Sequence, residues 1–185
     1  MSRTLRPAVF LDRDGVLNRS LVREGKPFSP RRLDEFRLVP GAAASVRALK
    51  EAGYVVVVVT NQPDIGNGHV TAELMAVIHA RLAGRVPVDD IMCCPHRRED
   101  GCDCRKPKPG MLLAAAERHG IDLERSILVG DRSGDIAAGV AAGCYTILIN
   151  RRYREPANAQ PHASVRSLAS AVRHILARQG QGPHR

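Results

Sequence analysis

The chain of 185 residues is 44% hydrophobic and 25% charged, which is enough for one domain over residues 1–185 with a sizeable core. No apolar run approaches the roughly 18 residues of a membrane span and no secretory signal is evident, so we expect a cytoplasmic monomer without membrane contacts. The formal net charge of +9 suits an anionic partner, but the absence of Trp and the presence of only three Tyr and three Phe disfavour a base-stacking nucleic-acid surface.

The first predicted element is a buried parallel strand over residues 8–11, which ends at two aspartates one residue apart and a glycine. In an extended segment Asp12 and Asp14 would project to the same side and repel each other unless a cation or a proton lies between them. Mg²⁺ is the simplest cation for such a pair. An Asp-x-Asp-Gly turn whose side chains cap their own backbone is the alternative, and the motif alone does not decide between the two.

Residues 19–40 are polar and contain Pro27 and Pro30, which suggests a loop or flap. A helix is expected from about residue 41 to 51, followed by a β-branched run over 54–62 that is apolar on both faces. Such a run is typical of a central parallel strand. Thr71 is the expected N-cap of a helix that continues to about Leu82, and residues 90–93 form a weaker strand candidate.

Beyond a cysteine-rich loop, the same alternation continues. The predicted elements are a helix over 109–119, a strand over 126–129, a helix that ends near 142, a strand over 145–149 and a helix over 168–178. Strands that alternate with helices predict an α/β, three-layer Rossmann-like fold with a parallel sheet, helices on both faces and the active site at the carboxyl ends of the strands.

The C-terminal segment, residues 151–185, follows a predicted core of about residues 8–150. It contains seven Arg and one acidic residue, Glu155, so it contributes +6 of the net charge of +9. A solvated basic helix face is a better interpretation of this segment than an anion-binding surface.

Polar groups follow three of the predicted strands: Asp12 with Asp14, Thr60 with Asn61, and Asp131 with Asp135. Independent capping could explain any one pair, but three such strand ends in one sheet favour a shared site. A fourth cluster, Arg105-Lys106-Pro107-Lys108, precedes a helix in a chain with 24 Arg and only four Lys. We expect Lys106 to bind a phosphoryl oxygen and Lys108 to be a solvated surface residue.

These four motifs, in this order, resemble those of the haloacid dehalogenase-like phosphohydrolases. The resemblance extends from residue 8 to about 149, and it departs from the usual pattern at Val16, where Thr is common after Gly15. It implies that Asp12 attacks phosphorus to form an aspartyl phosphate and that Asp14 serves as general acid and base. The other residues of such a site position the phosphoryl group and stabilise its charge.

The resemblance also implies the roles of the other site residues. Asp131, Asp12 and the backbone carbonyl of Asp14 would hold Mg²⁺. Thr60 and Lys106 would stabilise charge on the transferred phosphoryl group, with Asn61 as a further substrate-binding residue. Asp135 would orient Lys106 or a metal-bound water.

The cysteine-rich loop provides three thiolates and one imidazole, a usual ligand set for a tetrahedral structural zinc. These ligands are Cys94, His96, Cys102 and Cys104. A disulfide between Cys102 and Cys104 is disfavoured in a reducing cytosol, and unliganded cysteines are the remaining alternative.

The zinc loop next to Lys106 resembles two capless branches of the family, the D-glycero-D-manno-heptose 1,7-bisphosphate phosphatases and the histidinol-phosphate phosphatases. Only about 45 residues separate Thr60 from Lys106, so no large cap domain is expected. Arg105 and Arg132 favour the heptose branch, because two cations suit a second phosphate better than the cationic end of histidinol phosphate. Asn67, where relatives usually have Arg, and Pro63-Asp64 depart from that pattern and leave the sugar open.

We therefore expect a Mg-dependent phosphatase for a small sugar bisphosphate. Its expected reaction is removal of the 7-phosphate of D-glycero-D-manno-heptose 1,7-bisphosphate. Histidinol phosphate or another small sugar phosphate is the alternative. A zinc-stabilised nucleic-acid-binding module leaves the aspartates and Lys106 without a role. The sparse aromatic residues and the lack of an expected extra domain disfavour a DNA 3′-phosphatase. A non-catalytic relative is also conceivable, although every chemical position is intact.

Overall fold

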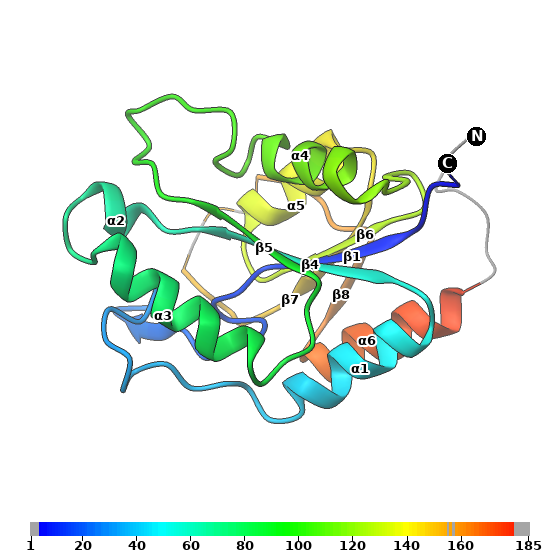
Figure 1. Cartoon of the computed structure of the whole chain (residues 1–185), viewed down its shortest axis with the longest axis horizontal. Coiled ribbons are helices and arrows are strands. Elements are labelled where there is room, and N and C mark those ends of the chain that lie inside the picture. Colours follow the sequence, from blue (N-terminus) through cyan, green and yellow to red (C-terminus); the bar gives the residue numbers. More distant parts are fainter. Residues whose placement is uncertain (1–3, 155, 157, 180–185) are drawn as a thin grey trace.

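A computed structural model describes residues 4–154, 156 and 158–179 of the chain. Its centre is a parallel sheet of six strands in the order β5-β4-β1-β6-β7-β8 (Figure 1). The strands are β1 (Ala8–Leu11), β4 (Val55–Asn61), β5 (Asp90–Cys94), β6 (Ile127–Gly130), β7 (Tyr145–Ile149) and β8 (Ala163–Val165).

Helices cover both faces of this sheet, as predicted (Figure 1). One face packs against α1 (Ala42–Glu51), α3 (Ala72–Ala83) and α6 (Leu168–Arg178), and the other against α4 (Gly110–His119) and α5 (Ser133–Ala141). The four residues of β1 are fully buried and alternate between the two cores. The predicted three-layer α/β fold is therefore confirmed.

Two predictions of strands from the sequence need correction. The expected flap contains a two-stranded hairpin, β2 (Leu21–Arg23) with β3 (Lys26–Phe28), and the sequence analysis did not predict β8. The hairpin turn places Glu24 and Gly25 at φ 51° and 79°. Such a turn matches the twist of a hairpin but is usually made by Asn-Gly or Asp-Gly, so a glutamate at its first position hid it.

The predicted basic segment is part of the sheet and its covering layer. It contributes β8 and then α6, whose buried side chains include Leu168, Val172 and Ile175, whereas Arg173 is exposed. Glu155 and residues 180–185 lie outside the described part of the chain. No helix within the described residues has the length and apolar character that a bilayer crossing requires.

The central strand β1 lies where the strand order reverses, between β4 on one side and β6 on the other. Ligands of open α/β sheets bind outside the carboxyl ends of strands at such a switch point. Between β4 and β5 the chain forms only α3 and the short helix α2 (Pro63–Gly66), so the described residues include no cap domain over this edge.

Candidate active site

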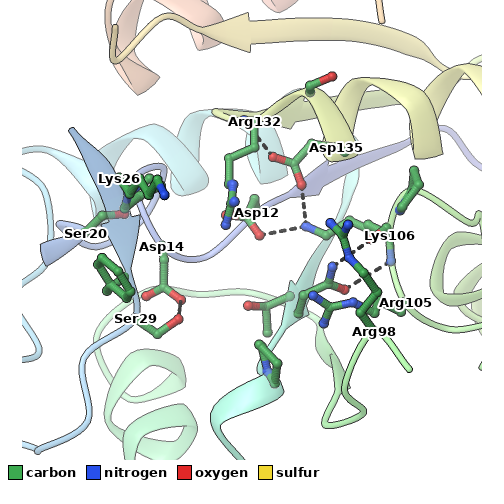
Figure 2. A pocket seen from close by; sticks show the side chains of 18 of the residues that line it. Asp12, Asp14, Ser20, Lys26, Ser29, Arg98, Arg105, Lys106, Arg132 and Asp135 are labelled. Atoms are coloured by element: carbon green, nitrogen blue, oxygen red, sulfur yellow. Dashed lines mark hydrogen bonds and ion pairs between the residues drawn. The ribbon is translucent and has the colours of Figure 1, made fainter. Parts of the chain in front are cut away.

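Asp12 follows β1 directly, and its carboxylate is paired with the buried Lys106 (Figure 2). Lys106 Nζ lies 2.7 Å from Asp12 Oδ1 and 2.6 Å from Asp135 Oδ1, and it donates to the Val59 carbonyl at 2.7 Å. Burial raises the pKa of Asp12 to about 7, although Lys106 opposes this and the neighbouring carboxylates Asp135 and Asp14 reinforce it. Burial would lower the pKa of Lys106, but Asp12 and Asp135 raise it above its usual value. The lysine is therefore a fixed cation beside the expected nucleophile.

Asp131, at the end of β6, brings a further carboxylate to the same point. Side-chain oxygens of Asp12, Asp131 and Asp135 all lie within 4.8 Å of one another. Burial raises the pKa of Asp131 well above its usual value, and the charges of Asp12 and Asp135 add to this effect. Asp131 Oδ1 is buried and has no hydrogen-bond partner. An unpartnered carboxylate oxygen in a cluster of like charges suits Mg²⁺, and Asp12 and Asp131 are the residues that would hold it.

Asp135 is committed to other partners. Its Oδ2 accepts hydrogen bonds from the backbone N–H groups of Asp131 and Arg132, at 3.1 and 3.0 Å, while its Oδ1 contacts Lys106. It thereby joins the start of α5 to the lysine. This geometry fits the predicted orienting role of Asp135, which stays a prediction.

The side chain of Asp14 points away from this carboxylate cluster toward four donors. It accepts from Arg13 Nη2 at 2.9 Å, Asn18 Nδ2 at 2.8 Å, Ser29 Oγ at 2.9 Å and Gln62 Nε2 at 2.8 Å. Burial would raise its pKa, but the Arg13 charge and the hydrogen bonds from Asn18 and Gln62 outweigh burial and lower it. Arg13 is itself completely buried. None of these four donors was predicted from the sequence, and Ser29 and Gln62 reach Asp14 only through the fold.

Thr60 and Asn61 end β4 next to Lys106. The Thr60 hydroxyl accepts from Gln62 Nε2 at 2.8 Å, so one amide group joins Thr60 to Asp14. Asn61 makes two hydrogen bonds with the main chain of Lys106, donating to its carbonyl at 2.9 Å and accepting from its N–H at 3.1 Å. Asn61 therefore fixes the Lys106 backbone, and one amide N–H remains for the predicted substrate contact.

A cavity of about 940 Å³ is lined by Asp12, Asp14, Thr60, Asn61, Lys106 and Asp135. Arg105 and Arg132, the predicted substrate-binding residues, both line it, and Figure 2 shows Arg132 extending from the start of α5 toward Asp12. Four further cationic side chains line the cavity and were not selected from the sequence, which are Lys26, Arg31, Arg98 and Arg154. More Lys and Arg than Asp side chains therefore line the cavity, and this positive charge suits an anionic ligand.

The four predicted zinc ligands form one compact cluster. Cys102 Sγ lies 3.6 Å from Cys94 Sγ and 3.5 Å from Cys104 Sγ, and His96 Nδ1 lies 3.7 Å from Cys94 Sγ and 3.3 Å from Cys104 Sγ. Ligands about 2.3 Å from a tetrahedral zinc are separated by about 3.8 Å, close to these values, whereas a disulfide needs about 2.05 Å. The cluster is joined to the cavity by Arg105, which lines the cavity and donates to the His96 carbonyl at 3.1 Å.

We expect the purified protein to contain about one zinc per chain and Cys102→Ser to lose it, because three ligands hold the ion poorly. The melting temperature and the activity should then fall together, since the loop positions Arg105. Metal analysis and thermal unfolding measure this, with Cys93→Ser as the matched control outside the cluster. Zinc-free protein with full activity would contradict the assignment.

Asp64 belongs to the Pro63-Asp64 pair, one of the departures from the family pattern, and its side chain has a defined partner. Asp64, in α2, forms a two-pronged ion pair with Arg31, whose Nε and Nη2 lie 2.9 and 3.0 Å from its two carboxylate oxygens. Both residues line the cavity with Asn67. The pair joins the segment after the hairpin to α2, so Arg31 is already engaged at this edge.

Comparison with known proteins places the chain in a family. A model described as HAD-hydrolase-like matches residues 103–171. The D-glycero-beta-D-manno-heptose-1,7-bisphosphate 7-phosphatase of Pseudomonas putida is 40% identical over 146 residues, which cover 76% of this chain and 81% of the relative. The protein of the same name from Pseudomonas aeruginosa is 40% identical over 154 residues, covering 80% and 82%.

A solved structure agrees with these sequence matches. The crystal structure of D,D-heptose 1,7-bisphosphate phosphatase from B. bronchiseptica, complexed with magnesium and phosphate, matches with a TM-score of 0.77 and 30% identity over 92% of this chain and 98% of that one. With the geometry described above, the chain belongs to the D-glycero-D-manno-heptose-1,7-bisphosphate 7-phosphatase family of haloacid dehalogenase-like hydrolases.

Proposed function

We propose that this protein is a Mg-dependent phosphatase that removes the 7-phosphate of D-glycero-D-manno-heptose 1,7-bisphosphate and leaves the 1-phosphate. The observation that supports it best is one cavity that contains both the Asp12–Lys106 pair and a set of cations beyond those a single phosphate needs. The substrate named for the relatives is the same bisphosphate.

In the proposed reaction Asp12 attacks the phosphorus in line and forms an aspartyl phosphate. Bound Mg²⁺ supplies positive charge that keeps the carboxylate ionised and stabilises the phosphoryl oxygens. Lys106 adds a second fixed cation at the same carboxylate, and the Thr60 hydroxyl can donate to the phosphoryl group because its oxygen already accepts from Gln62. These donors are in place before the substrate arrives.

Asp14 would act twice. It would protonate the leaving oxygen while Asp12 attacks, and it would deprotonate the water that hydrolyses the aspartyl phosphate. Arg13, Asn18 and Gln62 lower its pKa, so Asp14 is ionised in the free protein, which is the protonation state that a base for the hydrolytic water needs. For the acid step it must take up a proton, and the negative charge of a bound phosphate next to it would raise its pKa for that step. The free protein therefore supplies the base form of Asp14, and the acid form depends on the charge of the bound phosphate.

The second phosphate is the proposed basis of specificity. Arg105 and Arg132 could bind it while the first phosphate contacts Asp12, and charge-assisted hydrogen bonds are worth about 1.5–3 kcal/mol each, roughly ten- to a hundredfold in affinity. Such remote binding increases the rate only if it positions the reacting phosphate. Histidinol phosphate would instead place an ammonium group among these cations.

We expect kcat/KM for the heptose bisphosphate to exceed that for histidinol phosphate and for sugar monophosphates. Arg105→Ala should remove about ten- to a hundredfold of that preference and leave hydrolysis of a small phosphate ester unchanged. Arg97→Ala is the matched control, because Arg97 lies in the same loop but pairs with Asp100 at 3.0 Å. Steady-state kinetics on the four substrates measure the effect.

Better hydrolysis of histidinol phosphate than of the bisphosphate would replace the heptose assignment with the histidinol one. An equal loss on every substrate in Arg105→Ala would show that Arg105 does not read the second phosphate.

A further inference from the structure

The segment that follows β7, residues 151–154, returns over the active-site turn. Arg151 donates from Nε and Nη2 to the carbonyl of Gly15, at 2.9 and 2.7 Å, and the Arg154 N–H donates to the carbonyl of Gly25 in the hairpin at 3.0 Å. The start of the basic segment is therefore attached both to the Asp12–Gly15 turn and to the hairpin beside the cavity. Arg151 and Tyr153 have no place in the reaction as proposed above.

Tyr153 provides the most specific of these contacts. Its hydroxyl donates to Asp131 Oδ2 at 2.8 Å, whereas Asp131 Oδ1 is buried without a hydrogen-bond partner. The two oxygens of this carboxylate thus differ: one is fixed by a protein donor and the other is left for a ligand. A tyrosine hydroxyl keeps its single proton for this bond as long as it remains neutral.

Gly15 makes this approach possible. A Cβ added there would lie 1.7 Å from Asp131 Oδ2 and 3.0 Å from the Tyr153 hydroxyl oxygen, and Gly15 has φ +85°. Any other residue would push Asp131 and Tyr153 away from the turn. The glycine, the carboxylate and the phenol therefore fit together as one packed unit.

We infer that Tyr153 is a positioning residue of the magnesium site, which holds Asp131 by one oxygen so that the other faces the ion. The inference rests on the Mg dependence of the proposed function. Donors to a metal-ligating carboxylate restrict its orientation before the ion binds, and removing them typically weakens metal binding ten- to a hundredfold.

The test compares Tyr153→Phe with wild type in direct Mg²⁺ binding, measured by calorimetry after dialysis into Mg-free buffer. A strong chelator is avoided because it would also remove zinc. We expect the Kd for Mg²⁺ to rise about tenfold or more in Tyr153→Phe, with a melting temperature near that of wild type in Mg-free buffer. Tyr145→Phe is the matched control, since it also removes a hydrogen-bonded hydroxyl, 3.2 Å from His174 Nε2 and outside the cavity.

The absence of Trp gives a second readout. The chain has three Tyr, so Mg²⁺ binding should change the ultraviolet absorbance of tyrosine through Tyr153. This difference signal should persist in Tyr145→Phe and disappear in Tyr153→Phe.

An unchanged Kd for Mg²⁺ in Tyr153→Phe, or an equal rise in Tyr145→Phe, would overturn the positioning role. These outcomes are distinct from failure of the proposed function, which would appear as wild-type protein that binds Mg²⁺ but does not hydrolyse the bisphosphate.

Discussion

Asp12→Asn is expected to lower kcat by at least about 10⁴-fold, because the amide keeps the shape of the side chain but cannot attack phosphorus. Asp12→Ala should behave in the same way, and it controls for recovery of activity by deamidation of the asparagine. Single-turnover hydrolysis of the bisphosphate measures both. Activity within tenfold of wild type in either variant would contradict an aspartyl-phosphate mechanism.

The same substitution should stabilise the protein without Mg²⁺. Asp12 has a pKa of about 7 in the folded chain, above its ordinary value of 3.8, so the folded state binds a proton more tightly than the unfolded state. Its contribution to stability is present below about pH 4 and is lost as the pH rises through 7. At pH 8 the ionised Asp12 is one of three clustered carboxylates, and it shares a single lysine with Asp135.

We therefore expect the melting temperature of Asp12→Asn in Mg-free buffer to exceed that of wild type by several degrees at pH 8 and by less at pH 5. About 1 kcal/mol corresponds to roughly 2–4 °C for a chain of this size. Added Mg²⁺ should raise the wild-type value more than the variant's. A lower melting temperature of Asp12→Asn at pH 8 would show that Asp12 stabilises the fold through Lys106 more than it destabilises it.

Local sequence predicted the sheet and its edge well, because each strand end combines a buried apolar run with an abrupt polar stop. Val55 to Val59 can only be a central strand, and the residues that follow it must lie at the switch point. The cluster of Cys94, His96, Cys102 and Cys104 could be predicted equally well, since these four residues lie within 11 consecutive positions.

Contacts between segments far apart in the chain could not be predicted from the local sequence. Ser29 reaches Asp14 from the segment after the hairpin, and Tyr153 reaches Asp131 from the segment after β7. Neither residue has a motif, and each depends on a turn or crossover whose direction the local sequence does not determine. The hairpin itself was hidden by Glu24, whose positive φ is uncommon for a residue other than Gly, Asn or Asp.

Lys106 combines both kinds of information, because its motif was recognised from the sequence while its three partners became visible only in the structure. It is 5% exposed and neutralises Asp12 and Asp135 at once. Removing one member of a buried ion pair typically costs about 3–5 kcal/mol, because the remaining charge is left without a partner. Lys106→Ala leaves two such carboxylates.

We expect Lys106→Ala to lower kcat/KM by about 10²–10³-fold, the usual cost of removing one fixed donor at a developing negative charge, and to unfold at a lower temperature at pH 8. The loss of stability should shrink toward pH 5, because Asp12, with its raised pKa, can then take up a proton in place of the lysine charge. Mg²⁺ should restore part of the stability and little of the activity. Thermal unfolding across this pH range and steady-state kinetics measure the two effects.

The neighbouring Lys108 provides the matched control. It lies two residues away in the same motif, but its side chain is half exposed and its ammonium group pairs at 2.9 Å with Asp103, whose side chain is 95% exposed. Lys108→Ala should therefore change neither stability nor kcat/KM by more than about twofold, since a surface ion pair is worth roughly 0–1 kcal/mol. Equal effects of the two substitutions would mean that the motif acts through its general positive charge. A large effect of Lys106→Ala alone would assign the charge stabilisation to the one lysine that contacts Asp12.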